Sequence, residues 1–249
     1  MPSPPDAVIL CGGAGLRLRS VTGVGPKVMA GVGGRPFLEL LLRQLRRNGF
    51  ERAILAVGYQ KDAIRSHFGE QAFGLHLAYA AEDIPLGTGG ALRNAVDLAR
   101  SETVLVMNGD SYIDVDLRTL TAEHLRAKAD LTVVVAEADE RADCGFVLVD
   151  RDGRLTGFAE KQRVRHASYL NAGVYVAARR LLSEIPLGNE VSLERELVPT
   201  WLGQGRRIQA FVCTSSCVDI GTPDRYLAAQ AILATAEAEL STPQTGGRK

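Results

Sequence analysis

The part of the sequence best suited to chemistry is a glycine-rich loop near the amino terminus. The segment Leu10–Arg19 (LCGGAGLRLR) directly follows a short apolar run at Ala7–Leu10, which we predict to be a buried strand. Glycines let a ligand approach the main chain closely, and successive N–H groups in such a loop can bind an anion. Arg17, Arg19 and Lys27 add positive charge close by. These features predict a phosphate-binding loop, and the alternative is a tight turn without a ligand.

The spacing of the glycines excludes two common nucleotide-binding loops. No Gly-Lys-Ser/Thr follows, so the loop is not a Walker A motif, and Gly12, Gly13 and Gly15 do not match the dinucleotide fingerprint G-x-G-x-x-G. A second glycine-rich segment, Leu86–Gly90 (LGTGG), lies between a predicted strand and a predicted helix. Open α/β sheets bind ligands at such positions. This segment is therefore a second candidate for ligand binding.

Two aspartates are candidate ligands for a metal ion. Asp110 closely follows the buried strand predicted at Thr103–Met107, and Asp219 lies in VDIGTPDRY, shortly before a predicted helix. A carboxylate in such a place is costly unless it meets water, a cation or another partner. Mg²⁺ is often held by one or two carboxylates together with phosphate oxygens. The pair therefore predicts a Mg²⁺ site, whereas each aspartate alone would equally suit a helix N-cap or a turn.

The elements that must position these residues alternate between strands and helices in the first half of the chain. This rhythm indicates a mostly parallel sheet that is covered on both faces. The predicted strands are Ala7–Leu10, Ala53–Val57, Leu75–Tyr79 and Thr103–Met107, and the predicted helices are Phe37–Asn48, Lys61–Phe68 and Gly90–Ala99.

After Asp110 the pattern contains more strands than helices. The predicted strands are Thr132–Ala136, Cys144–Val149, Leu155–Glu160, Ala172–Ala177 and Arg207–Cys213, and the predicted helices are Leu117–Ala129, one near Leu193–Leu202, and one from Thr222-Pro223 to about Glu239. The sequence DRDG at Asp150–Gly153 predicts a hairpin turn. The polar tail at 241–249 is predicted to be disordered.

Composition narrows the classes of function. Lys plus Arg and Asp plus Glu are 29 each, so the basic excess expected of a nucleic-acid-binding protein is missing. No apolar run approaches the roughly 18–20 residues that span a bilayer, and the N-terminus MPSPPDAVIL lacks the features of a signal peptide. The spacing of Cys11, Cys144, Cys213 and Cys217 fits no common metal motif, so we expect reduced thiols. These observations predict a cytoplasmic protein without nucleic-acid or membrane partners.

Seven short motifs, taken in order, resemble the pattern of the sugar 1-phosphate nucleotidyltransferases. They are GGAGLRL (Gly12–Leu18), PK (Pro26-Lys27), LGTGG (Leu86–Gly90), GD (Gly109-Asp110), EK (Glu160-Lys161), NAG (Asn171–Gly173) and DIGTP (Asp219–Pro223). The chain departs from the family pattern at Leu16, where a threonine is usual, and at Val28, where a proline is common. The likeness extends from residue 7 to about residue 235.

The resemblance implies an α/β fold, the Rossmann-like three-layer nucleotidyltransferase (GT-A-like) fold with a mixed, mostly parallel central sheet. It implies a single domain at 1–240, with a nucleotide-binding half at 1–112 and a sugar-phosphate-binding half at 113–240. It leaves a homodimer open. The implied reaction is attack of a sugar 1-phosphate oxygen on the α-phosphorus of a nucleoside triphosphate, with pyrophosphate leaving.

The resemblance also implies roles for particular residues. Nucleotide binding falls to Leu10, Gly12, Gly13, Gly15, Arg17, Glu82, Gly87 and Asp110, and sugar-phosphate binding falls to Gly145, Glu160, Lys161, Asn171 and Gly173. Arg17, Lys27 and Asp110 would be catalytic, and Asp110 and Asp219 would hold Mg²⁺. Such phosphoryl chemistry needs mainly alignment and charge stabilisation from the protein.

Within the family, the stretches Glu82–Ala91 and Asn108–Leu117 are similar to those of D-glycero-D-manno-heptose 1-phosphate guanylyltransferases. Glu82 stands at the base-reading position, where a carboxylate can accept from two N–H groups of guanine, so GTP is favoured. The alternatives are a uridylyl-, adenylyl- or mannose-1-phosphate guanylyltransferase, or a catalytically silent regulatory homologue. A silent homologue would be free to lose the set that this chain retains, namely Arg17, Lys27, Asp110, Lys161 and Asp219.

Overall fold

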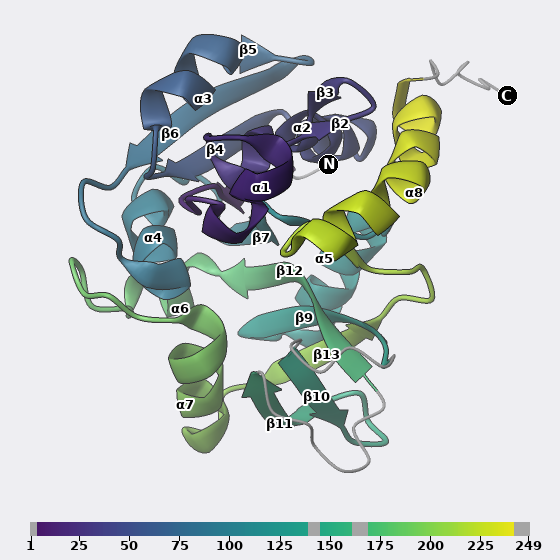
Figure 1. Ribbon diagram of the computed structural model, residues 1–249. Coiled ribbons are helices and arrows are strands. Elements are labelled where there is room, and N and C mark those ends of the chain that lie inside the picture. The colour runs from purple at the N-terminus through teal and green to yellow at the C-terminus, as the bar shows by residue number, and fades with distance from the viewer. Residues whose placement is uncertain (1–3, 139–144, 161–168, 242–249) are drawn as a thin grey trace, which may run out of the picture.

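The computed structural model describes residues 4–138, 145–160 and 169–241, and a mixed sheet forms its centre (Figure 1). Four parallel strands make up the first half of the sheet, in the order β7 (Thr103–Asn108), β1 (Asp6–Leu10), β4 (Arg52–Val57) and β6 (Leu75–Ala81). The short β5 (Gln71–Ala72) pairs antiparallel with β6 at the edge. The central strands are short apolar runs and are buried on both faces, as parallel strands between helices must be.

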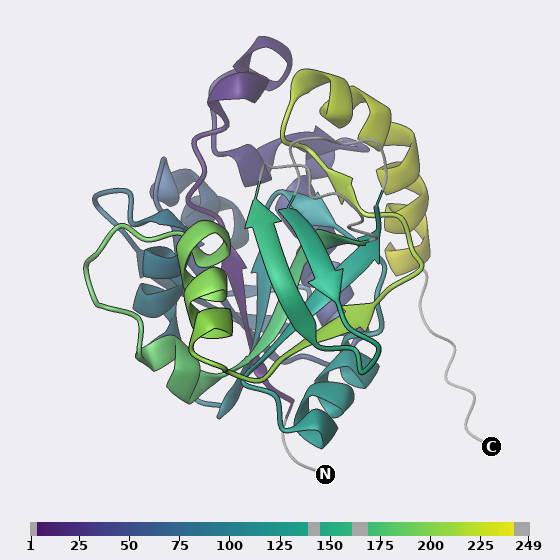
Figure 2. The ribbon, with the colours of Figure 1, turned by 90° about the horizontal axis from the view of Figure 1, so that it is seen from below.

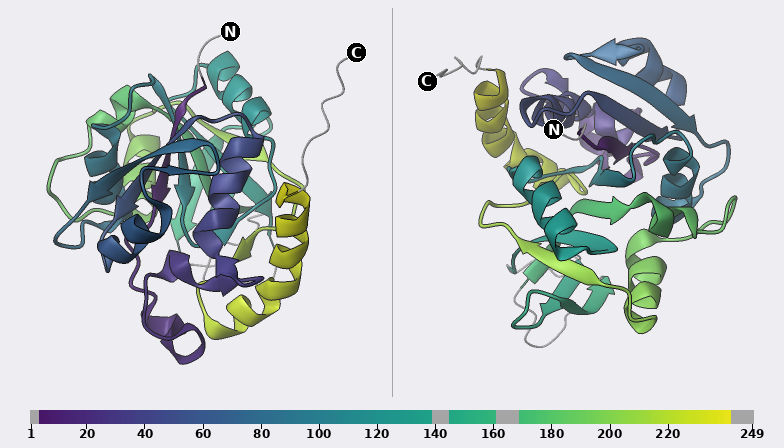
Figure 3. Two further views of the ribbon diagram at one scale, coloured as in Figure 1. Left: turned by 90° about the horizontal axis from the view of Figure 1, so that it is seen from above. Right: turned by 180° about the vertical axis from the view of Figure 1, so that it is seen from behind.

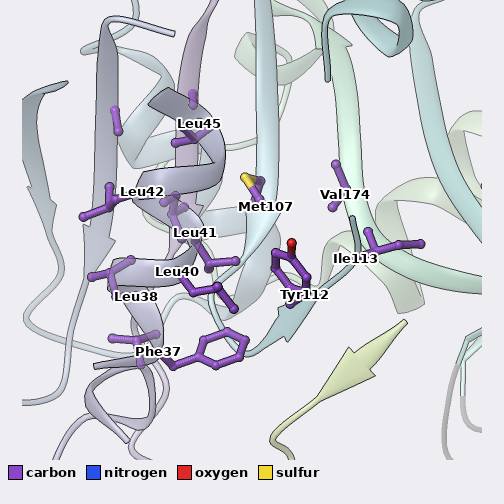
Figure 4. Packing of buried hydrophobic residues seen from close by; sticks show 14 of the residues in the cluster. Phe37, Leu38, Leu40, Leu41, Leu42, Leu45, Met107, Tyr112, Ile113 and Val174 are labelled. Carbon is purple, nitrogen blue, oxygen red and sulfur yellow. The ribbon is translucent and has the colours of Figure 1, made fainter. Parts of the chain in front are cut away.

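Successive side chains of a strand point into two different hydrophobic layers, because strand side chains alternate between faces. Ala7 and Ile9 of β1 belong to the first layer, and Val8 belongs to the second. The first layer is covered by α2 (Phe37–Arg47), α3 (Lys61–Phe68), α5 (Leu117–Ala127) and α8 (Pro223–Ser241), and the second by α4 (Gly87–Val96), α6 (Arg179–Ser183), the π-helical turn η3 (Leu193–Leu197) and α7 (Val198–Gly203). Figure 4 shows leucines of α2 packed toward Met107 and Tyr112 in the first layer.

The strand β12 (Tyr169–Ala178) joins the parallel half of the sheet to an antiparallel half. It pairs antiparallel with β7, with β9 (Leu131–Glu137) and with β10 (Gly145–Val149). From β10 the chain turns into the hairpin partner β11 (Leu155–Glu160), and β13 (Ile208–Val212) adds a parallel strand beside β9. Figure 2 views this half of the molecule with the β10–β11 hairpin facing the reader.

The register of β12 is interrupted between Asn171 and Tyr175. Gly173, inside this interruption, has a φ of 73°, in the left-handed region that favours glycine. Irregularities of this kind bend a strand and re-aim its side chains. The NAG motif therefore coincides with the point where β12 departs from regular pairing.

Small elements connect these layers. They are η1 (Leu16–Leu18), α1 (Arg19–Thr22), η2 (Lys27–Met29), the antiparallel pair β2 (Gly31–Val32) and β3 (Arg35–Pro36), and the antiparallel pair β8 (Ser111–Tyr112) and β14 (Val218–Asp219). The long α8 lies beside α2 (Figure 3), so the last described helix closes over the amino-terminal half. Among the described helices, none combines the length and the apolar character that a membrane span requires.

The expected mixed α/β sheet with helices on both faces is confirmed. Both α3 and β11 have the bounds that the sequence pattern predicts. The prediction for the helix at Gly90–Ala99 is wrong in register, because α4 begins at Gly87 and ends at Val96. The strand predicted from Cys144 starts at Gly145, and Cys144 lies outside the described residues. Of the tail predicted at 241–249, Ser241 is the last residue of α8 and the rest lies outside the described residues.

Candidate active site

Two adjoining cavities lie where β1 and β7 end. The loop cavity, of about 320 Å³, is lined by part of the glycine-rich loop, by Glu82 and by Gly87. The polar cavity, of about 500 Å³, is lined by residues that include Arg17 and Asn171. Among the residues that the structure describes, four line both cavities and form what we call the shared wall, namely Lys27, Thr88, Asn108 and Asp110. A molecule in one cavity can therefore meet a molecule in the other at these four residues.

The glycine-rich loop folds back on the segment that carries Lys27. The main-chain nitrogen of Lys27 donates to the carbonyl oxygen of Gly13 at 3.1 Å. Gly15 has a φ of 58°, and a Cβ there would lie 3.3 Å from the Cα of Lys27, so this close approach depends on glycine. Leu10, Gly12 and Gly13 line the loop cavity. The loop thus forms one side of that cavity and supports Lys27 at the shared wall.

The two arginines of the loop have different environments. The exposed side chain of Arg17, in η1, lines the polar cavity. Arg19 instead donates from Nη2 to the hydroxyl of Tyr59 at 3.1 Å, and its guanidinium lies 5.6 Å from the centre of that ring. Arg17 is therefore the loop arginine that faces a ligand cavity, and Arg19 ties the loop to the segment after β4.

Lys27 and Asp110 form an ion pair at the shared wall. The Nζ atom of Lys27 lies 2.5 Å from Oδ2 of Asp110, and the two side chains are 12% and 41% exposed. Asp110 follows β7 after Gly109, whose N–H donates to the carbonyl of Leu10 at 3.0 Å. A Cβ at Gly109 would lie 2.4 Å from that carbonyl oxygen, so glycine is needed to bring Asp110 against the loop. The pair places one positive and one negative charge at the junction of the cavities.

The short pair β8–β14 brings the two predicted metal ligands together. It sets Asp219 opposite the residue that follows Asp110, and the N–H of Ile220 donates to the carbonyl of Asp110 at 2.9 Å. The carboxylate of Asp219 accepts from the N–H of Gly221 at 2.8 Å and from Nη1 of Arg225 at 3.1 and 3.2 Å. Both aspartates line the polar cavity.

These carboxylates fit a magnesium ion by their chemistry, because Mg²⁺ prefers oxygen ligands and commonly takes one or two carboxylates. Each has a basic partner, Lys27 for Asp110 and Arg225 for Asp219, which balances its charge. Within the part of the chain that the structure describes, no group of three or more His, Cys, Asp or Glu residues is arranged to hold a metal ion. Water or oxygens of a bound phosphate would therefore have to complete the ligand set at this pair.

Glu82 lies just beyond the end of β6 and is partly buried beside the loop cavity. Its Oε1 would be 2.9 Å from a Cβ at Gly12 and 2.8 Å from a Cβ at Gly58, so both glycines leave room for it. Its Oε2 is buried without a hydrogen-bond partner among the described residues. Burial raises the pKa of Glu82, and a hydrogen bond from the main chain of Leu86 opposes this effect. The carboxylate is thus placed to accept a hydrogen bond from a ligand.

The glycines of the LGTGG motif make room for another segment of the protein. The motif forms the first turn of α4, where the N–H groups of Gly89 and Gly90 donate to the carbonyl of Val191 at 2.8 and 3.3 Å. The N–H of Val191 in turn donates to the carbonyl of Leu86 at 2.9 Å. These bonds satisfy N–H groups that a helix start leaves open, which explains why α4 begins three residues earlier than predicted. Gly87 also lines the loop cavity.

The NAG motif lines the polar cavity through Asn171 and Gly173. The amide oxygen of Asn171 accepts from the N–H of Gly173 at 3.1 Å, and its nitrogen donates to the hydroxyl of Tyr175 at 2.6 Å. A Cβ at Gly173 would lie 2.6 Å from Oγ of Ser111. The interruption in β12 therefore turns the Asn171 amide toward the cavity and lets the strand pass close to β8.

The remaining sugar-side prediction falls partly outside the described residues. Gly145 lines the polar cavity, and its main chain lies opposite Glu160 in the β10–β11 pair. Lys161 and the side chain of Glu160 are outside the described residues. The structure therefore places the main chain of Glu160 beside Gly145, at the edge of the polar cavity.

Sequence reasoning missed three charged residues among those described in the lining of the polar cavity, namely Glu194, Arg195 and Arg225. Arg225 lies in the first turn of α8, directly after the DIGTP motif, so its position could have indicated a partner for Asp219. Glu194 is a buried acid in the η3 segment, and no motif or spacing distinguishes it from the neighbouring polar residues.

The fold and the site define a class of protein. Residues 6–236 match the model of the family described as nucleotidyl transferase, and the chain belongs to this family. The resemblance to sugar 1-phosphate nucleotidyltransferases noted in the motifs is thereby confirmed.

Individual relatives give a more specific comparison than the family model does. The chain is 37% identical over 230 residues to the mannose-1-phosphate guanylyltransferase of Mycobacterium tuberculosis. The aligned region covers 92% of this chain and 64% of the relative. The chain is 36% identical to the D-glycero-alpha-D-manno-heptose 1-phosphate guanylyltransferase of Aneurinibacillus thermoaerophilus, covering 90% of this chain and 96% of that one. The crystal structure of HddC from Yersinia pseudotuberculosis complexed with GMP-PN superimposes with a TM-score of 0.80 at 31% identity, covering 92% of this chain and 99% of HddC.

Proposed function

We propose that this protein transfers a guanylyl group from GTP to a sugar 1-phosphate, D-glycero-D-manno-heptose 1-phosphate, and releases pyrophosphate. The observation that carries the proposal is the shared wall, because it lets two phosphate-bearing ligands meet at Lys27 and Asp110. The similarity to two guanylyltransferases, one acting on this heptose 1-phosphate, supports the choice of substrates.

In the proposed reaction, GTP occupies the loop cavity and the sugar 1-phosphate occupies the polar cavity. A phosphate oxygen of the sugar phosphate forms a bond to the α-phosphorus, and the bond from that phosphorus to the bridging oxygen of pyrophosphate breaks. The N–H groups of Gly12 and Gly13 would face the triphosphate. Lys27 would neutralise charge on the reacting phosphates. Arg17, which lines the polar cavity, would stabilise the departing pyrophosphate where the triphosphate extends past the shared wall.

Asp110 and Asp219 would hold Mg²⁺ near the shared wall. The ion, when bound, would screen the charge of two approaching anions. The ion pairs of these carboxylates with Lys27 and Arg225 support this role, since they keep both acids oriented toward the polar cavity.

We assign guanine recognition to Glu82. Glu82 lines the loop cavity, and its carboxylate, of which Oε2 has no hydrogen-bond partner among the described residues, would accept from guanine N1–H or N2–H₂. On the other side, the amide of Asn171 would donate to an oxygen of the sugar phosphate, and Gly145 and Gly173 would allow its close approach. Glu160 and Lys161, expected from the motif to bind the sugar phosphate, complete the assignment.

The experiment that tests this function is a matrix of GTP, UTP and ATP against heptose, mannose and glucose 1-phosphates, read as pyrophosphate release. We expect the highest kcat/KM with GTP and the heptose 1-phosphate. A higher kcat/KM with mannose 1-phosphate would assign the protein to the activity of the 37% identical relative instead. No pyrophosphate from any pair would favour a silent regulatory homologue.

The metal assignment is tested separately. Chelation should abolish turnover and added Mg²⁺ should restore it. Asp110→Asn and Asp219→Asn keep the shape of the side chain, and each should lower kcat by about a hundred-fold or more. The matched control is Asp97→Asn, because the exposed Asp97 directly follows α4 and pairs with Arg93. Turnover close to that of the control in both variants would contradict the metal site.

A further inference from the structure

Glu194 is a buried carboxylate for which the transfer reaction above gives no role. It is 8% exposed and lines the polar cavity. Of the described residues, three contact it through hydroxyl groups. Tyr175 lies 3.3 Å from Oε1, and Thr88 and Ser192 lie 2.6 and 3.3 Å from Oε2. A carboxylate has no hydrogen to donate, so each of these hydroxyls must donate to Glu194.

This requirement sets the direction of the hydrogen bonds on the sugar side. Since the single hydrogen of the Tyr175 hydroxyl points to Glu194, its oxygen accepts from Nδ2 of Asn171, which lies 2.6 Å away. The amide oxygen of Asn171 is already engaged by the N–H of Gly173 at 3.1 Å. The amide is therefore held at both ends, and its nitrogen carries a second hydrogen for an oxygen acceptor in the polar cavity.

The same carboxylate sets the direction of hydrogen bonds on the nucleotide side. The Thr88 hydroxyl donates to Glu194 and accepts from the N–H of Leu193 at 2.8 Å. Thr88 belongs to the shared wall, so its orientation bears on both cavities. The segment before Glu194 is in turn fixed to the start of α4 through Val191, which accepts from Gly89 at 2.8 Å.

We propose that Glu194 is a positioning residue that orients the sugar-side amide of Asn171 and the Thr88 hydroxyl of the shared wall at the same time. The proposal rests on the function proposed above and adds a specific chemistry to it. Asn171 is presented as a hydrogen-bond donor, so the group it recognises is an acceptor oxygen of the sugar phosphate. If the Tyr175 hydroxyl donated in the opposite direction, the Asn171 amide would no longer present an N–H group to the polar cavity.

The first test uses Tyr175→Phe, which cuts the chain between Glu194 and Asn171 and leaves Thr88 in place. We expect the KM for heptose 1-phosphate to rise about ten-fold, with the KM for GTP changed by less than about two-fold. Glu194→Gln introduces an amide that can donate to one of the hydroxyls, and it should raise the KM of both substrates. The matched control is Tyr79→Phe. The Tyr79 hydroxyl donates to the carbonyl of Gly69, and Tyr79 is not among the described lining residues of either cavity.

A double-mutant cycle separates positioning from general destabilisation. In an Asn171→Ala background, Tyr175→Phe should raise the KM for the sugar phosphate by less than about two-fold further, because the group it orients is gone. The proposal would be overturned if Tyr175→Phe raised the KM for the sugar phosphate as much in the Asn171→Ala background as in the parent. It would also be overturned if Tyr175→Phe left that KM unchanged in the parent. If Tyr175→Phe does not fold, the cycle is run with Glu194→Gln under the same expectation. An inactive parent enzyme would overturn the proposed function, and with it this role.

Discussion

Lys27 is the residue on which charge balance at the shared wall depends. Its ammonium group lies 2.5 Å from Asp110, so removing it leaves a carboxylate facing the expected triphosphate. We expect Lys27→Ala to lower kcat by about a hundred-fold or more with every sugar 1-phosphate, because the positive charge that Lys27 places at the reacting phosphates is removed. Steady-state pyrophosphate release measures this. Lys61→Ala is the control, since Lys61 pairs with the exposed Asp83, and equal losses in the two variants would contradict the assignment.

Glu82 allows a prediction about base selection. Glu82→Gln keeps the shape of the side chain but replaces one acceptor oxygen by a donor, which would face an N–H group of guanine. A buried donor left without an acceptor costs about 1–3 kcal/mol, so the ratio of GTP to UTP use should fall by roughly ten-fold. Competition between the two triphosphates in one reaction gives the ratio directly. An unchanged ratio would indicate that the main chain of the loop cavity reads the base.

The raised pKa of Glu82 adds a pH dependence to that selection. Burial favours the neutral acid, so Glu82 takes up its proton at a higher pH than an ordinary glutamate. The preference for GTP over UTP should therefore be complete well above this raised pKa and should weaken as the pH falls through it. In Glu82→Gln the same ratio should not vary with pH. Identical pH profiles for the parent and the variant would show that the carboxylate is not involved.

At the scale of elements, the start of α4 and the segment before η3 depend on each other. A Cβ at Gly90 would lie 2.3 Å from the carbonyl oxygen of Asn189 and 2.8 Å from Cβ of Leu86. We expect Gly90→Ala to destabilise the protein by about 1–3 kcal/mol and to lower Tm by about 5–10 °C. Gly203→Ala in α7 is the control, because nothing lies within 4 Å of that site, and alanine there should leave Tm unchanged or slightly higher. Equal Tm values in the two variants would count against this packing.

The same contact marks the limit of what the sequence could predict. Local sequence patterns were enough to predict α3 and the β10–β11 hairpin. An apolar stripe specifies the helix and a turn sequence specifies the hairpin, so neither depends on residues far away in the chain. The start of α4 could not be predicted, since its glycines are stabilised by Val191, which is far away in the chain. Motifs identified Lys27, Asp110 and Asp219 as a group. Nothing local marked Glu194, whose importance arises only from the hydroxyls that the fold brings around it.

For the molecule as a whole, His124 predicts how stability varies with pH. The imidazole is buried in α5 beside the hydroxyl of Thr132, at 2.9 Å from Nδ1. Burial lowers its pKa from 6.5 to about 4, an effect that the charge of Asp130 opposes. The folded protein therefore binds fewer protons than the unfolded chain between these pH values, and its free energy of unfolding falls as the pH drops through this window. The loss contributed by His124 is at most about 3 kcal/mol.

Urea unfolding of the parent and of His124→Gln between pH 7 and pH 4 measures this contribution. Glutamine can still bond to Thr132 but does not titrate, so the free energy of unfolding of the variant should depend less on pH. The two curves should converge as the pH falls. Parallel curves across the whole range would show that His124 is not the titrating group.

The place of β12 in the sheet has a consequence for the order in which the chain is made. β7 is an interior strand only because β12 pairs with it, and β12 leaves the ribosome after residues 109–168 have been synthesised. Until then the apolar run Thr103–Asn108 forms an open sheet edge, which is the kind of surface on which nascent chains aggregate. We therefore expect the yield of the protein in cells to be sensitive to pausing before residue 169 and to improve when a chaperone covers this edge.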